Sequence, residues 1–101
     1  MPSINYEYVP FDGEALSVGA TAVGVTTATA FPAGAGAKKA VGDVQVAAVR
    51  FRYDGTAPTA TVGHIAEVGD AINLEDPNEV INFKAIRKDG VTATIFFTFE
   101  R

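Results

Sequence analysis

The sequence predicts an all-β fold: one antiparallel β-sandwich domain over residues 1–101, immunoglobulin-like or jelly-roll-like, with about seven short strands. Residues 47–53 and 91–99 alternate between two sets of side chains, which is typical of half-buried strands. Turn residues rich in Gly, Pro and Asp separate the alternating segments at a spacing of roughly 8–12 residues. No segment has a convincing helical period, and the length fits a single domain.

The first element is extended and aromatic. Tyr6 and Tyr8 fall on one face of residues 1–11, and Pro10 cannot donate to a β-ladder, so a strand here is expected to be short or at an edge. We interpret residues 1–11 as an extended N-terminal arm that either joins its own sheet or lies on a neighbouring protein. Asp12-Gly13 then predicts a turn.

The next segments differ in their alternation. Residues 16–30 change parity near residues 22–24, which predicts two short strands or one bulged strand. Residues 31–42 are rich in Gly and Ala and predict a loop. Residues 44–53 predict the longest strand, and a second change of parity near Val46 indicates either a bulge or burial on both faces.

A structural turn is predicted at the end of that strand, formed by Asp54, Gly55, Thr56 and Pro58. Asp-Gly accommodates the positive φ that tight turns need. Pro58 fixes its own φ and restricts the residue before it to extended conformations. The segment is therefore expected to form a rigid corner that redirects the chain.

Short alternating segments make up the C-terminal part. After an irregular stretch at residues 63–69, the pattern predicts strands at residues 71–75, 79–87 and 91–99, with Ile72 and Leu74 pointing inward. Lys88-Asp89-Gly90 predicts a hairpin, so the last three strands are expected to form a meander. The closing strand places Val91, Ala93, Ile95, Phe97 and Phe99 on one face, and Phe96 on the other.

Few residues in this chain are suited to catalysis. It has one His (His64), no Cys, and serines only at positions 3 and 17, outside any nucleophile-elbow pattern. His64 is interpreted as a surface or hydrogen-bonded structural residue, and each Asp near a turn is explained by turn formation. We therefore predict from the sequence that the protein is not an enzyme, and that it has no catalytic residue, metal site or cofactor.

Charge and hydropathy restrict the partners. The formal net charge is −4 and the basic residues are scattered, which argues against nucleic-acid binding. No apolar run, leader-like N-terminal segment or basic amphipathic face predicts membrane contact, so a soluble protein is expected. The extra aromatic residues instead suggest a protein-binding surface made of Tyr6, Tyr8, Val9, Phe11 and Phe96.

An ordered set of short motifs follows residue 45. The segment Arg52-Tyr-Asp-Gly-Thr-Ala-Pro-Thr59 is followed by Gly63-His64, Gly69-Asp70, Asn82-Phe-Lys-Ala-Ile-Arg87 and the strand 92–99. This set resembles the pattern of small virion proteins of tailed bacteriophages, encoded among head and tail genes. The resemblance covers about residues 45–101, and residues 1–44 match no part of the pattern.

The resemblance implies a non-enzymatic structural protein of the virion, assembled in the host cytoplasm. The role it favours is a capsid decoration, or cement, protein bound to the major capsid protein or other virion proteins of the assembled head. Such proteins commonly act as trimers or as monomers at symmetry axes, so a homo-oligomer is expected, with a trimer as one option.

Two alternatives stay open. One is a tail or neck accessory protein of the virion. The other is a non-catalytic carbohydrate-binding module, because a similar Asp-Gly-Ser/Thr-x-Pro-Thr turn occurs in immunoglobulin-like accessory domains of glycosidases. The absence of Trp argues against the second alternative.

Overall fold

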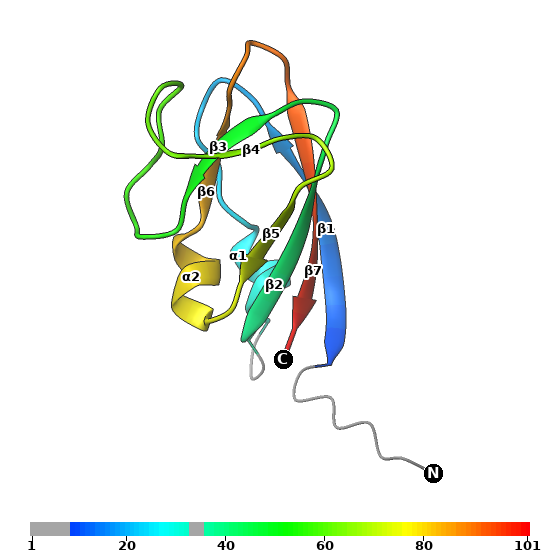
Figure 1. Ribbon diagram of the computed structural model, residues 1–101. Coiled ribbons are helices and arrows are strands. Elements are labelled where there is room, and N and C mark those ends of the chain that lie inside the picture. Colours follow the sequence, from blue (N-terminus) through cyan, green and yellow to red (C-terminus); the bar gives the residue numbers. More distant parts are fainter. Residues whose placement is uncertain (1–8, 33–35) are drawn as a thin grey trace.

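The computed structural model describes residues 9–32 and 36–101, and it confirms the predicted all-β class (Figure 1). Seven strands and two short helices occur in the described part of the chain. In order they are β1 (Pro10–Val18), α1 (Thr27–Ala30), β2 (Lys39–Gln45), β3 (Val49–Arg52), β4 (His64–Ala66), β5 (Ala71–Leu74), α2 (Pro77–Asn82), β6 (Lys84–Arg87) and β7 (Ala93–Glu100).

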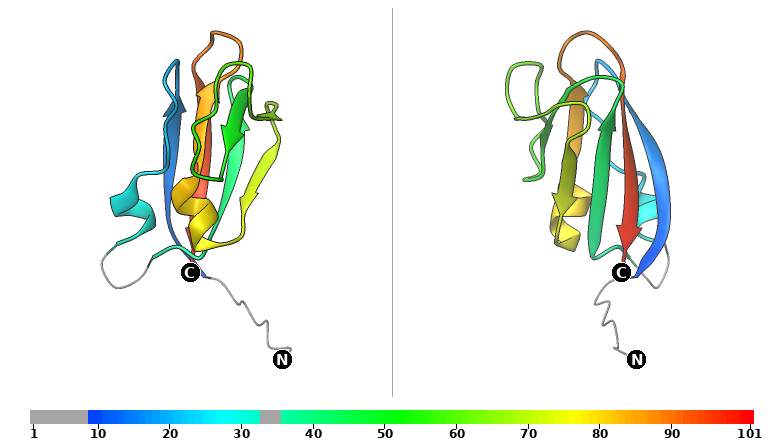
Figure 2. Two further views of the ribbon diagram at one scale, coloured as in Figure 1. Left: turned by 90° about the vertical axis from the view of Figure 1, so that its left-hand side faces the viewer. Right: turned by 45° about the vertical axis from the view of Figure 1, so that its right-hand side comes forward.

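The strands form two antiparallel sheets, one in the order β1-β7-β2-β5 and the other in the order β4-β3-β6. A division into four and three strands is also that of a constant-type immunoglobulin sandwich. The connectivity differs, because β7 lies between β1 and β2 instead of beside β6. The helix α2 lies below β6, at the lower end of the three-stranded sheet, in Figures 1 and 2.

One core lies between the sheets. Within β7 the alternation is as predicted, since Ala93, Ile95, Phe97 and Phe99 are fully buried and Phe96 is exposed. Val91, which was predicted on the buried face, precedes the strand and is 52% exposed. The inward orientation predicted for Ile72 and Leu74 on β5 is also confirmed. The largest fully buried side chains come from both sheets and from α2: Phe83, Phe97, Phe99, Leu74, Ile95, Val18, Val44, Val49 and Val80.

The predicted hairpin at residues 88–90 and the meander are wrong. β6 pairs with β3, whereas β7 pairs with β1 and β2, so residues 88–92 carry the chain from one sheet to the other. Gly90 has the positive φ of a turn residue, 75°. Alternation specifies which residues of a strand face the core, but it is the same whether the next strand lies beside it or across the core.

The predicted long strand at residues 44–53 is two strands in different sheets. β2 ends at Gln45, Val46 has a φ of 74°, and β3 begins at Val49. The change of parity therefore marks the residue where the chain leaves one sheet for the other. The preceding loop is also shorter than predicted, because β2 begins at Lys39; residues 33–35 lie outside the described residues.

The turn predicted at Asp12-Gly13 is wrong, because both residues lie inside β1. The Asp12 carboxylate accepts a hydrogen bond of 2.8 Å from the Gly13 N–H. A Cβ at Gly13 would lie 2.8 Å from the backbone oxygen of Phe97, so close strand contact explains this glycine. β1 is an edge strand with Pro10 as its first residue, but at nine residues it is not short.

The predicted strand at residues 79–87 is α2 followed by β6. The Asp76 carboxylate accepts a hydrogen bond of 2.7 Å from the Asn78 N–H, and Pro77 occupies the first helical turn. Asp76 is thus the N-cap of a helix, and Pro77 follows it at a position where proline is favoured. Neither helix of the described segments is long and apolar enough to cross a membrane.

Two further predictions concern short segments. Of the second strand predicted within residues 16–30, only an isolated bridge between Val23 and Ala85 is present, followed by α1. The stretch at residues 63–69, predicted to be irregular, contains β4.

Candidate functional site

Of the residues predicted to bind a partner, the structure describes Val9, Phe11 and Phe96, and Phe11 and Phe96 lie on opposite faces of their sheet. Tyr6 and Tyr8 lie outside the described residues. Val9 is exposed and exchanges backbone hydrogen bonds with Arg101 at the end of β7. Phe11 packs against the core, with the Arg101 guanidinium 4.5 Å from its ring centroid.

Phe96 lies on the outer face of the four-stranded sheet, where 43% of its surface is exposed. Its neighbours in register are Ala15 on β1 and Asp43 on β2, and Asp43 pairs with Ala71 on β5. The end of the Phe96 ring lies 3.4 Å from the place a Cβ would take at Gly13. The Phe96 ring therefore lies beside Gly13 and Ala15 on the β1 side and beside Asp43 on the β2 side.

The residues of the predicted structural turn form a compact corner after β3. The Asp54 carboxylate pairs with the Arg52 guanidinium and accepts a hydrogen bond of 3.2 Å from the Thr56 N–H. Gly55 has a φ of 89°, which a residue with a Cβ adopts only at a cost. Pro58 is buried although the surrounding loop is exposed.

The loop that follows is held by Arg50 on β3. The Arg50 guanidinium donates to the backbone oxygens of Ala60 and Gly63, at 2.9 and 3.3 Å. Gly63 has a φ of 143°, and a Cβ there would lie 3.1 Å from the Phe51 oxygen and 3.2 Å from Pro58 Cβ. The corner is thus fixed at both ends, because the segment that returns from it, residues 60–63, contacts Arg50 and Phe51 of β3.

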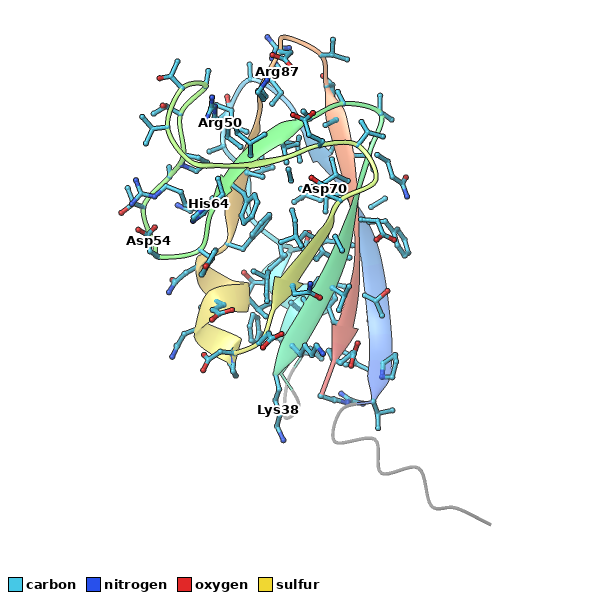
Figure 3. The ribbon with its side chains drawn as sticks, viewed as in Figure 1. Lys38, Arg50, Asp54, His64, Asp70 and Arg87 are labelled. Carbon is cyan, nitrogen blue, oxygen red and sulfur yellow. The ribbon has the colours of Figure 1, made fainter. Side chains whose placement is uncertain are left out.

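This corner places two rings side by side. In the β3–β4 register Phe51 is opposite His64. Tyr53 lies two residues after Phe51, so strand alternation places the Tyr53 side chain on the same face as those of Phe51 and His64. The Tyr53 and His64 rings are stacked with centroids 5.7 Å apart and planes at 21°. Figure 3 shows His64 and Asp54 on the same flank of the molecule, with Lys38 at the far lower end.

The two rings are the exposed end of a row of aromatic rings that runs through the core. Neighbouring rings have centroids 5.1 to 6.4 Å apart. From the corner to the opposite end the members are Tyr53, His64, Phe51, Phe83, Phe97, Phe99 and Phe11. Because Phe51 contacts both exposed rings and rests on buried Phe83, the stacked pair is supported from below.

An open hollow of about 420 Å³ lies at this end of the three-stranded sheet. Its lining combines the two rings with the ion pair of the corner and the returning loop: Arg52, Tyr53, Asp54, Val62, Gly63 and His64. We take it as the candidate ligand site because aromatic and charged side chains meet in its lining. No three His, Cys, Asp or Glu side chains among the described residues lie close enough together to hold a metal ion.

The pH dependence of stability should report the Asp54 interactions. The hydrogen bond from Arg52, and then that from the Thr56 N–H, hold the pKa of Asp54 below its usual range. The carboxylate therefore stabilises the fold fully above its unfolded-state pKa of about 3.9, and this contribution is lost as the pH falls through the lower folded-state pKa.

Thermal unfolding of wild type and Asp54→Asn tests this sign. From about pH 5 to about pH 2 the wild-type Tm should fall more steeply than that of the variant. The difference is expected to be small, because the ion pair is largely exposed. Parallel curves would show that the charge of Asp54 does not contribute.

The conformation of Gly55 gives a second test of the corner. Gly55→Val should destabilise the protein by about 1–2 kcal/mol, because its φ of 89° is strained for a residue with a Cβ. Gly55→Asn is the matched control, since Asn tolerates positive φ better. Urea unfolding should rank the two variants in that order, and equal stability of the Val variant and wild type would contradict the assigned geometry.

The hollow was only partly foreseeable. The sequence indicated the corner and its alternation placed Tyr53 on the same face as Phe51, but His64 was interpreted as a surface or hydrogen-bonded structural residue. Their contact depends on the β3–β4 register, which the sequence pattern does not specify. No protein-family model, curated protein or solved structure matches this chain.

Proposed function

We propose that the protein is a non-enzymatic structural component of a tailed-phage virion that decorates and stabilises the assembled head. The observation that carries this proposal is the outer face of the four-stranded sheet, where exposed Phe96 lies beside Gly13, Ala15 and Asp43. Aromatic side chains are enriched in protein interfaces, where a few such residues supply most of the binding energy. The motif resemblance supplies the class of partner, the major capsid protein or another virion protein.

The N-terminal arm is the second part of this proposal. β1, which contains the last two residues of the predicted arm at residues 1–11, begins at Pro10 on the edge of the same sheet. Tyr6 and Tyr8 are proposed to extend the contact onto the neighbouring capsid subunit, by pairing along one of its edge strands. Deleting residues 2–8 leaves β1 intact and tests the arm separately. If the shortened protein occupied capsids as fully as wild type, the arm would have no part in binding.

Cosedimentation with purified heads of the encoding phage tests the role of the outer face. Phe96→Ala should weaken head binding by at least about tenfold, the loss expected for an interface anchor. Ile65→Ala is the matched control, because Ile65 is similarly exposed but lies on the outer face of the other sheet. Wild-type binding by Phe96→Ala, or an equal loss in both variants, would contradict the proposal.

The alternative within the virion is a tail or neck accessory protein. It has the same protein-binding chemistry and differs in location and stoichiometry. A decoration protein is expected on the head lattice in a fixed ratio to the major capsid protein, as a trimer or a monomer at a symmetry axis. A connector is expected as one ring.

A further inference from the structure

We infer that the hollow beside the corner is a binding site for an uncharged sugar ring. It lies on the three-stranded sheet, away from the face proposed to contact the capsid, and in this chain without Trp its aromatic surface comes from Tyr53 and His64. The inference comes from four properties of the lining: the rings, the ion pair, the volume and the local charge.

The rings supply an apolar surface of the right shape. Tyr53 is 40% exposed and His64 is also exposed, although Tyr53 stacks on His64 and on Phe51, and the His64 ring is tilted against Phe51. The C–H face of a pyranose is flat and apolar, and it packs on such rings without losing its hydroxyl hydrogen bonds to water. The support from Phe51 and Phe83 means that little side-chain entropy is lost on binding.

The ion pair supplies polar groups for the rim of the sugar. Arg52 and Asp54 orient each other, and the Thr56 N–H fixes the carboxylate further. Carboxylate oxygens have more lone pairs than these contacts use, and a guanidinium has five N–H donors. A hydroxyl group both donates and accepts, so it suits a site in which an acceptor and a donor lie side by side.

Charge and volume argue against other ligands. The positive charge of Arg52 is compensated by Asp54, so the lining offers no net attraction to a phosphate or carboxylate. A bare aromatic ligand would use the rings but leave the ion pair without partners. A volume of about 420 Å³ lies within the range of roughly 300–1,000 Å³ typical of small-molecule sites.

NMR titration of the full chain tests the inference. The probes are the methyl glycosides of glucose, galactose and N-acetylglucosamine, each added to about ten times a Kd of ~1 mM, with inorganic phosphate as a charged comparison. At least one glycoside should produce saturable shifts centred on the amides of Tyr53, Gly63 and His64, and phosphate should not. Absence of saturable shifts there with all three glycosides, or shifts with phosphate alone, would overturn the inference.

Variants locate the binding. Tyr53→Ala and His64→Ala should each raise the Kd at least about tenfold, whereas Ile65→Ala, adjacent to His64 on the opposite face of β4, should bind as wild type. Undisturbed shifts of the buried β7 amides establish that each variant is folded. Glycoside binding unaffected by Tyr53→Ala would overturn the site. Head binding by the same variant should remain at the wild-type level, so the two proposals fail separately.

Discussion

Phe97→Ala should destabilise the protein by about 3–5 kcal/mol and lower Tm by at least about 12 °C. Phe97 is fully buried on β7. The centroid of its ring lies 5.1 Å from that of Phe83, which packs against it from the other side of the core. In the row of aromatic rings, Phe97 connects the rings of the four-stranded sheet to Phe83. Its removal therefore leaves a cavity between the two sheets. The loss is a large fraction of the total stability of about 5–15 kcal/mol that is typical of single domains.

The adjacent residue gives the control. Phe96→Ala removes the same side chain from the outer face, where it is 43% exposed, and should cost less than about 1 kcal/mol. Thermal and urea unfolding of the two variants compare identical chemistry at consecutive positions. Similar losses would mean that β7 does not present alternate residues to core and solvent.

Gly42→Ala has the second largest expected effect, a destabilisation of about 1–3 kcal/mol. Gly42 lies in β2, and a Cβ there would be 2.7 Å from Phe97 Cε1 and 2.9 Å from Ile95 Cγ2. The added methyl group therefore forces buried side chains of β7 to move. The usual gain from replacing Gly by Ala, about 0.4–1 kcal/mol, is too small to offset this overpacking.

Gly19→Ala is the matched control for that substitution. No atom lies within 4 Å of the place its Cβ would take, so this variant should be neutral or slightly stabilising. A Gly42→Ala, Phe97→Leu double variant should lose less than the sum of the single losses, because a smaller side chain relieves the overlap. Additive losses would show that Gly42 and Phe97 are not in contact.

The sequence determined much of the fold because burial has a local signature. Strands β5 and β7 alternate strictly, and their inward residues were predicted correctly from that period. The alternation pattern does not indicate which of the two sheets a strand joins. Val46 and the segment 88–92 both separate alternating runs, and in each case the chain changes sheet where a bulge or a hairpin was expected.

The short helix α2 was missed for a different reason. Asp76-Pro77 is equally compatible with a turn and with a helix N-terminus. Burial of Val80 decides between them, whereas Ile81, which would share the face of buried Phe83 in a strand, is 54% exposed. At the candidate site the corner could be predicted from Asp54-Gly55 and Pro58, but the partnership of Tyr53 with His64 requires the strand register.

The most direct test of the proposed virion role is the composition of native particles of the encoding phage. Quantitative mass spectrometry of intact virions and of separated heads and tails would give the copies of this protein relative to the major capsid protein. We expect the protein on the heads, in a fixed ratio that matches the capsid lattice. Its absence from particles, or a single ring of copies confined to neck or tail, would contradict a decoration role.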